Sequence, residues 1–577
     1  MNSKEITKNI QPAPPAIDLD NPDIKTSKAF GALAKVADDL SRESTKAAWI
    51  LEKNRERAWP WIVSWARAAL DSRPTTRTGE QAIDQLLYVA PHLLLRYIKG
   101  EDFEPTPPND NFSAKCFASR PTIVALALEL WLLGDALNHP DVLFLVQVAG
   151  GFISSCFRCT MKNSPARDHC YAVLRSPRWD IPATLLKGII REATLKDMHP
   201  RALSPYLLLM CTLLDFNSQI PTAFIEDCIR KSAPRWATFV LRKLASPPYI
   251  GKPGAASCVV GALSIVESCS KFDCFSIIEA LDLDFLSSLF RHRDLVANDD
   301  SLAQSYSRVL DVLMEQMHHR ALAVRVIRSM KKIARMNLNA STYLKNYGRA
   351  TESWTMLCKV ANGRWTPGKT GLGWYEVTIC GHEECAHRRT LKLNHKFKRC
   401  SGCLAEIYCS AECQKGAWKV HRRECDAKRE RARAGQSQYE PSPLDLAFVY
   451  KCVYEDFHTP DIFRKLIHAP ITNLKEHPVL LIDYREDARK IEPVPLSQAE
   501  ILIKETKSDL SSTDLEEAFS GFAIIPWRMQ KLIVVLIRTD SDRTVTSQAE
   551  KTRVNWRRLA PRMLTMLRLT DPLLKKP

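Results

Sequence analysis

The chain has 577 residues, 45% of them apolar and 25% charged, and this length exceeds what one hydrophobic core usually organises, so we expect two or three domains. Its apolar runs fall short of the roughly 20 residues that cross a bilayer, and residues 1–28 lack the apolar core of a signal peptide, so a membrane-spanning or secreted protein is excluded. The formal net charge of +17 raises the question of a nucleic-acid partner, and such binding would be salt-sensitive and non-specific.

The N-terminal residues and the long region after them have different patterns. Residues 1–27 contain four prolines and no helical period, which predicts a disordered arm. From residue 28 the apolar residues recur at three- and four-residue steps, as in Phe30, Leu33 and Val36, and strand signals are scarce. We therefore predict a mainly α fold in which residues 28–362 form a large all-helical domain. Its helices would pack as an irregular bundle or as a solenoid-like superhelix of helix pairs, and no shared repeat motif decides between the two.

The 18 cysteines fall into two groups. Eleven are scattered, mostly in apolar helical contexts where a free thiol behaves as a small hydrophobic side chain. This distribution excludes a disulfide scaffold and predicts a protein of the reducing cell interior, in the cytoplasm or the nucleus.

After a predicted linker at residues 363–379, the other seven cysteines and one histidine form four short-spaced pairs. Zinc takes four tetrahedral thiolate or imidazole ligands, and pairs of this spacing can bend around one ion. Eight ligands saturate two Zn2+ ions and leave no open position for water or substrate, so both ions would be structural. The predicted ligands are Cys380, Cys385, Cys400, Cys403, Cys409, Cys413, His421 and Cys425.

The residues between these ligands carry a Cys-Ser-Gly-Cys knuckle at 400–403, a Tyr-Cys-Ser run at 408–410, Trp418, and a closing His-x3-Cys. With these motifs, residues 380–425 resemble the MYND zinc finger. The late position of the finger in a long helical chain is also similar to the layout of fungal MYND finger proteins.

The resemblance implies a cross-brace, in which alternate pairs of ligands share an ion. One ion would be held by Cys380, Cys385, Cys409 and Cys413, and the other by Cys400, Cys403, His421 and Cys425. The first pair is spaced by four residues where two is commoner, so His382 stays open as a replacement for Cys380.

MYND fingers as a family dock proline-containing peptides. Carried over to this sequence, the resemblance places the peptide groove at Ser401 in the knuckle, Gln414 with its amide, and Trp418 with its indole face. The alternative is that Trp418 packs the small core of the finger itself.

Residues 426–443 form a second predicted linker, and residues 444–577 differ in pattern from the helical region. A helix over 444–457 is followed by strand-like apolar runs at 479–484 and 532–538. We expect residues 522–525 to pair with the last of these runs, which predicts a small α+β C-terminal region.

The absence of catalytic motifs distinguishes a binding protein from an enzyme. MYND fingers also occur inside lysine methyltransferases, where the finger interrupts a SET domain. Such an enzyme would need an Asn-His-Ser-Cys-type motif and a Gly-rich turn after the finger, and residues 426–577 contain neither. We therefore predict that the protein is not an enzyme. It would be a zinc-binding adaptor for protein–protein interaction whose partner offers a short proline-containing motif.

Two alternatives stay open. The first is a transcription regulator that contacts DNA through the basic finger region, which has 14 Lys and Arg against seven acidic residues in 380–434. The second is a methyltransferase-related enzyme.

Overall fold

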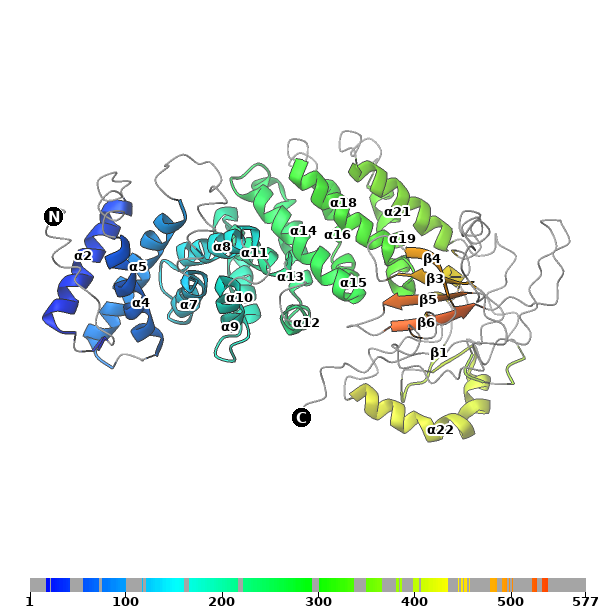
Figure 1. The fold of residues 1–577 in the computed structure, drawn as a ribbon. Helices are drawn as coiled ribbons and strands as arrows, with labels where there is room; N and C mark the ends of the chain where they lie inside the picture. The colour runs from blue at the N-terminus through cyan, green and yellow to red at the C-terminus, as the bar shows by residue number, and fades with distance from the viewer. Residues whose placement is uncertain are drawn as a thin grey trace. The chain divides into compact units, whose positions relative to one another are not determined.

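In the computed structural model, the described residues are concentrated in the helices, the strands and the finger (Figure 1). They divide between two compact units, Met1–Ser268 and Cys269–Pro577. The described residues are 17–20, 22–41, 55–71, 75–99, 117, 121–159, 165–215, 222–292, 300–336, 349–365, 380–382, 384–386, 398–403, 406–433, 445, 448–449, 451–453, 456, 478–484, 490–495, 498, 501, 521–526 and 532–537.

The regular elements described in the first unit are all helices. Its elements are α2 (Ile24–Ser41), α4 (Arg55–Asp71), α5 (Arg77–Lys99), α7 (Ile123–Ala136), α8 (Val142–Cys159), α9 (Pro165–Leu174), α10 (Ile181–Thr194), α11 (Pro200–Asp215), α12 (Thr222–Arg230), α13 (Ala233–Leu244), the short 3-10 helix η1 (Pro247–Tyr249), and α14 (Ala255–Phe272), which crosses into the second unit. Neighbours in sequence pack together, as α7 does with α8 and α10 with α11. The mainly α fold is confirmed, and whether the packing follows a superhelical repeat stays a prediction.

Helix α2 begins at Ile24, inside the predicted disordered arm of residues 1–27. Asp23 explains this early start, because its carboxylate accepts a hydrogen bond of 2.6 Å from the backbone amide of Thr26 and so caps the first turn. The buried face of α2 then packs on α4, where the Phe30 ring stacks on Trp65 with 3.7 Å between ring centroids.

Helix α14, with 18 residues, is the one helix in the described part of the chain that is long and apolar enough to cross a membrane. Of its residues, 72% are buried inside the protein. Gly261 lies so close to Leu207 of α11 that a methyl group at Gly261 would meet the Leu207 side chain at 3.0 Å. These contacts are those of a core helix.

The second unit combines helices, a sheet and the finger. Its helices are α15 (Cys274–Asp282), α16 (Phe285–Arg291), α18 (Asp300–Glu315), α19 (Arg320–Arg335), α21 (Arg349–Trp365) and α22 (Ala411–Arg433). Helix α21 packs along α18 and α19, and α19 also packs on α15 and α16 (Figure 1). Because α21 continues to Trp365, it includes the first residues of the predicted linker 363–379. Helix α22 likewise runs eight residues beyond Cys425, into the predicted linker 426–443.

The C-terminal sheet has the strand order β4-β3-β5-β6 (Figure 1). Its strands are β3 (Pro478–Asp483), β4 (Lys490–Pro495), β5 (Gly521–Pro526) and β6 (Leu532–Ile537). Strand β3 pairs antiparallel with β4 and parallel with β5, and β5 pairs antiparallel with β6. The predicted strands at 479–484 and 532–538 are therefore present, together with the expected pairing of residues 522–525. Strand β4 was not predicted, because Pro493 and Pro495 argue against a strand; both are tolerated at an edge of the sheet.

A buried polar cluster joins α21 to the segment that follows the finger. The Arg364 guanidinium donates hydrogen bonds to the Asp456 carboxylate at 2.5 Å and to the Cys452 carbonyl at 2.9 Å. Tyr484, one residue after β3, donates its hydroxyl to the same carboxylate at 2.6 Å, and the Lys451 ammonium donates to the Arg364 carbonyl at 2.9 Å. We call Arg364, Cys452, Asp456 and Tyr484 the Arg364 cluster. Since the finger lies between Arg364 and Asp456 in sequence, the cluster fastens the chain on both sides of it.

Candidate metal centre

Short local elements place the ligands. Strands β1 (Lys398–Arg399) and β2 (Ile407–Tyr408) form an antiparallel hairpin, and the Cys400 amide donates to the Glu406 carbonyl at 2.9 Å. The turn of the knuckle therefore begins directly after β1, and Cys409 follows β2. Ser410 then caps α22, because its hydroxyl accepts from the Cys413 amide at 3.2 Å.

Helix α22 carries its ligands at four-residue steps. Cys413, Ala417, His421 and Cys425 are all buried, whereas the residues on the other sides of the helix are mostly exposed. Side chains four residues apart lie on the same face of a helix. One face of α22 therefore supplies ligands to both clusters, with the small Ala417 between them.

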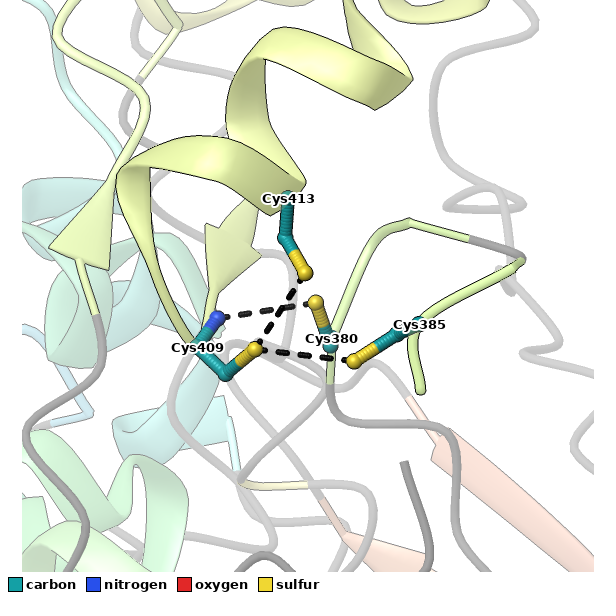
Figure 2. A group of neighbouring side chains, drawn as sticks. All are labelled: Cys380, Cys385, Cys409 and Cys413. Atoms are coloured by element: carbon teal, nitrogen blue, oxygen red, sulfur yellow. Dashed lines mark hydrogen bonds between the residues drawn. The ribbon is translucent and has the colours of Figure 1, made fainter. Parts of the chain in front are cut away.

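The first cluster contains four buried cysteines whose sulfur atoms all lie within 4.8 Å of one another: Cys380, Cys385, Cys409 and Cys413. Figure 2 shows their thiol groups pointing toward one another. The Cys409 sulfur is 3.5 Å from that of Cys385 and 3.4 Å from that of Cys413. The Cys409 amide also donates to the Cys380 sulfur at 3.5 Å.

The second cluster contains Cys400, Cys403, His421 and Cys425, whose ligand atoms again lie within 4.8 Å of one another. Nε2 of His421 is 3.4 Å from the Cys400 sulfur and 3.5 Å from the Cys403 sulfur. The Cys400 and Cys425 sulfurs are 3.7 Å apart. The structure thus brings the eight predicted ligands together in the two sets that the cross-brace implies.

The electrostatics of these clusters fit a divalent cation. Burial raises the pKa of the Cys400 thiol, but hydrogen bonds from the Cys403 backbone and the His421 ring bring it down to about 7. The pKa of Cys425 is raised to about 12, first by burial and then by its S–H···S hydrogen bond to Cys400. Buried thiols this close cannot all ionise beside one another unless a cation compensates them. Zinc, with its preference for four tetrahedral S and N ligands, meets that requirement, so the clusters are two structural zinc sites.

His382 lies beside the first cluster and outside it. Burial raises the pKa of the Cys413 thiol, but hydrogen bonds with the Cys409 thiol and then with the His382 ring bring it down to about 7. A methyl group on Gly416 would meet Nε2 of His382 at 2.7 Å, so the ring occupies the space that this glycine leaves. The cluster contains Cys380 as its fourth member, and His382 is placed as an outer hydrogen-bond partner.

Tyr408 was missed as a central residue of the finger. It is fully buried among the seven cysteines and Ala417, and its ring lies edge-on to that of His421 with 6.1 Å between centroids. The alternation of Ile407 and Tyr408 before a cysteine could have indicated it, since a finger this small needs at least one large buried side chain.

The three predicted peptide-binding residues are accessible to different degrees. Trp418 is 42% exposed and its ring is tilted against His421 with 5.9 Å between centroids. It is therefore not part of the finger's buried core, which is formed by the cysteines, Tyr408 and Ala417. Gln414 is half-buried four residues earlier on the same side of α22, and Ser401 is exposed in the knuckle.

Comparison with known proteins assigns the finger but not the whole chain. Residues 380–425 match the family described as the MYND finger. The mouse histone-lysine N-methyltransferase SMYD3 is 49% identical over 70 residues, which are 12% of this chain and 15% of the mouse protein. The human histone-lysine N-methyltransferase SMYD3 is 47% identical over 49 residues, 8% of this chain and 11% of the human protein. No solved structure matches the chain.

These matches show that the chain carries a MYND finger, usually a protein-interaction module, with zinc-binding clusters. The chain spans less than a sixth of the length of the methyltransferases it matches, 15% and 11%. The activity of those methyltransferases is therefore not carried over to this chain.

Proposed function

We propose that the protein is an adaptor whose MYND finger docks a short proline-containing segment of a partner protein. The observation that carries this proposal is an exposed indole on a metal-fixed frame: Trp418 is 42% exposed and lies one residue after the buried Ala417. A frame held rigid by two zinc ions loses little conformational entropy when a peptide docks on it. The flat indole face suits a proline ring, and the adjacent Gln414 offers amide groups to the peptide backbone.

The proposal includes no catalysis at the metal sites. Each cluster supplies four protein ligands to a tetrahedral ion, so no coordination position is left for a substrate or a hydrolytic water. When bound, zinc supplies charge compensation and shape to the finger. The enzyme alternative would be supported instead by a saturable site for a small-molecule cofactor in the purified chain.

Peptide docking is tested with the full chain and a labelled peptide that has a Pro-Pro-Leu core and serine flanks. We expect Trp418→Ala to weaken binding about thirtyfold, the loss of about 2 kcal/mol typical of an aromatic anchor, while zinc content stays unchanged. Fluorescence anisotropy measures the affinity.

Val420→Ala is the matched control, because Val420 is 67% exposed on the same helix but two residues away, on another side. It should leave binding unchanged. Equal affinity of the wild type and the Trp418→Ala variant, or equal binding of a peptide with an alanine core, would refute docking at the indole.

A further inference from the structure

A row of basic side chains follows α22 beside the exposed indole. Lys415, Lys419 and Arg422 are all exposed, and their three- and four-residue spacing places them along one line of the helix. We call these three residues the basic row. Trp418 lies three residues after Lys415 and four residues before Arg422, so it is a neighbour of both. Three positive charges therefore border the proposed peptide anchor within about 10 Å along the helix axis.

The ion pairs formed by the described residues of α22 do not include the charged groups of the basic row. Asp426 accepts from the Arg429 guanidinium at 2.6 Å. The pKa of Glu412 is lowered mainly by the Ser410 hydroxyl and by the backbone at the helix start, and only to a smaller extent by Lys398 and Lys415. In the part of the finger that the structure describes, Lys419 and Arg422 form no ion pair.

We infer that the partner segment carries acidic residues next to its proline, and that the basic row selects for them. This inference rests on the proposed docking at Trp418. An extended peptide advances about 3.3 Å per residue, so a carboxylate one to three residues from a proline on the indole reaches the amines of Lys415 and Lys419 or the guanidinium of Arg422. The guanidinium can hold a carboxylate through two parallel hydrogen bonds, and the two lysines act as point charges.

The length of the row favours a peptide over a nucleic acid. Three cations on two turns of one helix match two or three carboxylates, whereas a nucleic acid adds a phosphate every few ångströms and gains affinity from a longer charged track. The neighbouring indole adds an apolar contact that an acidic, proline-containing peptide can use and that a duplex with stacked bases cannot reach.

The test compares three labelled peptides that share a Pro-Pro-Leu core and differ only in their flanks, which are aspartate, serine or lysine. At low salt the aspartate-flanked peptide should bind the full chain about tenfold more tightly than the serine-flanked one, and the lysine-flanked peptide should bind most weakly. The differences should shrink as salt is raised, because exposed charges are screened.

Two neighbouring substitutions give a matched pair. Arg422→Glu should remove most of the preference for aspartate flanks, measured as the ratio of the affinities for the aspartate-flanked and serine-flanked peptides in the same variant. Arg423 is also exposed but points about 100° further around the helix, so Arg423→Glu should change the preference much less. The zinc content of both variants is measured, since a row that only balances the charge of the zinc–thiolate sites would alter metal retention and leave peptide preference intact.

The outcomes separate the two proposals. If all three peptides bind equally and still depend on Trp418, the selection for acidic flanks is refuted and docking stands. If none binds, docking itself fails. If a random-sequence DNA duplex displaces the aspartate-flanked peptide and binds more tightly, the basic row is a nucleic-acid surface and the inference is overturned.

Discussion

The second unit contains buried charged groups in two places, the metal-binding finger and the Arg364 cluster. The charge of these buried groups is compensated in different ways. In the finger, seven cysteines and one histidine converge with no cationic side chain among them. In the Arg364 cluster, the buried carboxylate of Asp456 meets a buried guanidinium and a tyrosine hydroxyl from the same chain. The finger therefore needs a cation from solution, whereas the Arg364 cluster carries its own. We therefore expect folding of the finger to depend on zinc, and folding of the helices and sheet around it to proceed without zinc.

The cysteines of the first unit sharpen this contrast. Cys258 is buried, and burial raises the pKa of its thiol to about 12. Burial, followed by the nearby Asp227 carboxylate, raises the pKa of Cys228 to about 12 as well. These thiols stay neutral and pack as small apolar side chains. The same residue type is thus a core side chain in one region and a metal ligand in the other, and what decides is the number of other ligands within reach.

The largest effect should come from removing the metal. A strong chelator should release two zinc ions per chain and unfold the finger, because structural zinc contributes about 10–16 kcal/mol to the folding of such sites. Circular dichroism should then lose only the helical signal of α22 and keep that of the other helices. A cooperative loss of helicity throughout the chain would contradict independent folding of the finger and of the helices and sheet around the Arg364 cluster.

Single cysteine substitutions test the same contrast one residue at a time. Cys403→Ser should lower the zinc content from two ions to about one, since a serine hydroxyl is a poor zinc ligand. Cys258→Ser should leave two ions bound and lower the free energy of unfolding by about 1–2 kcal/mol through a polar group in the core. Elemental analysis and urea unfolding measure the two effects. Loss of zinc from the Cys258→Ser variant would contradict the assignment of Cys258 as a core side chain and not a metal ligand.

The Arg364 cluster should resist chelation but not the loss of its cation. Arg364→Met removes the buried guanidinium that balances the charge of the Asp456 carboxylate and leaves the hydrogen bond from the Tyr484 hydroxyl in place. The uncompensated buried charge should cost about 3–5 kcal/mol in urea unfolding while two zinc ions stay bound. The double variant Arg364→Met/Asp456→Leu should recover most of that loss. Arg349→Met is the control on the same helix: its side chain is 75% exposed and 3.8 Å from Asp311, and exposed pairs contribute less than about 1 kcal/mol. Equal losses for Arg349→Met and Arg364→Met would refute the role of burial.

The smallest effect concerns an exposed carboxylate in the first unit. Hydrogen bonds from the backbone and hydroxyl groups of Thr75 and Thr76 lower the pKa of Asp20 to about 2. Because the folded-state pKa lies below the unfolded-state value, this carboxylate stabilises the fold fully above about pH 4, and the contribution is lost as the pH falls toward 2. Asp20→Asn should lower the melting temperature slightly at neutral pH and not at pH 2, whereas Asp84→Asn, at an exposed position on α5, should change neither.

The finger could be predicted from the sequence because its metal ligands lie close together along the chain. Pairs such as Cys400 and Cys403 lie within one turn, and ligand spacing alone restricts them to a metal site. The exposure of Trp418 could not be predicted, since a helical tryptophan one residue from a buried alanine fits a core position as well as a surface one. The strand β4 was missed for a related reason. Pro493 and Pro495 are compatible with a strand only at a sheet edge, and the local sequence does not show which strand lies at the edge.

The Arg364 cluster was missed entirely. Arg364 and Asp456 are 92 residues apart, and neither lies in a motif that would mark it as buried. Residues 363–365 were assigned to a linker because Gly363 and a later proline weaken the helical pattern. Only the tertiary fold shows that this arginine lies buried in the last turn of α21.

The position of the Arg364 cluster also bears on how the protein can be divided. A fragment that stops before Asp456 leaves the guanidinium of Arg364 buried without its carboxylate, so such a fragment should be poorly stable even though it retains every helix up to α22. The finger, by contrast, could be excised and replaced by a short tether between the two fastened ends, with α21 and the sheet left intact.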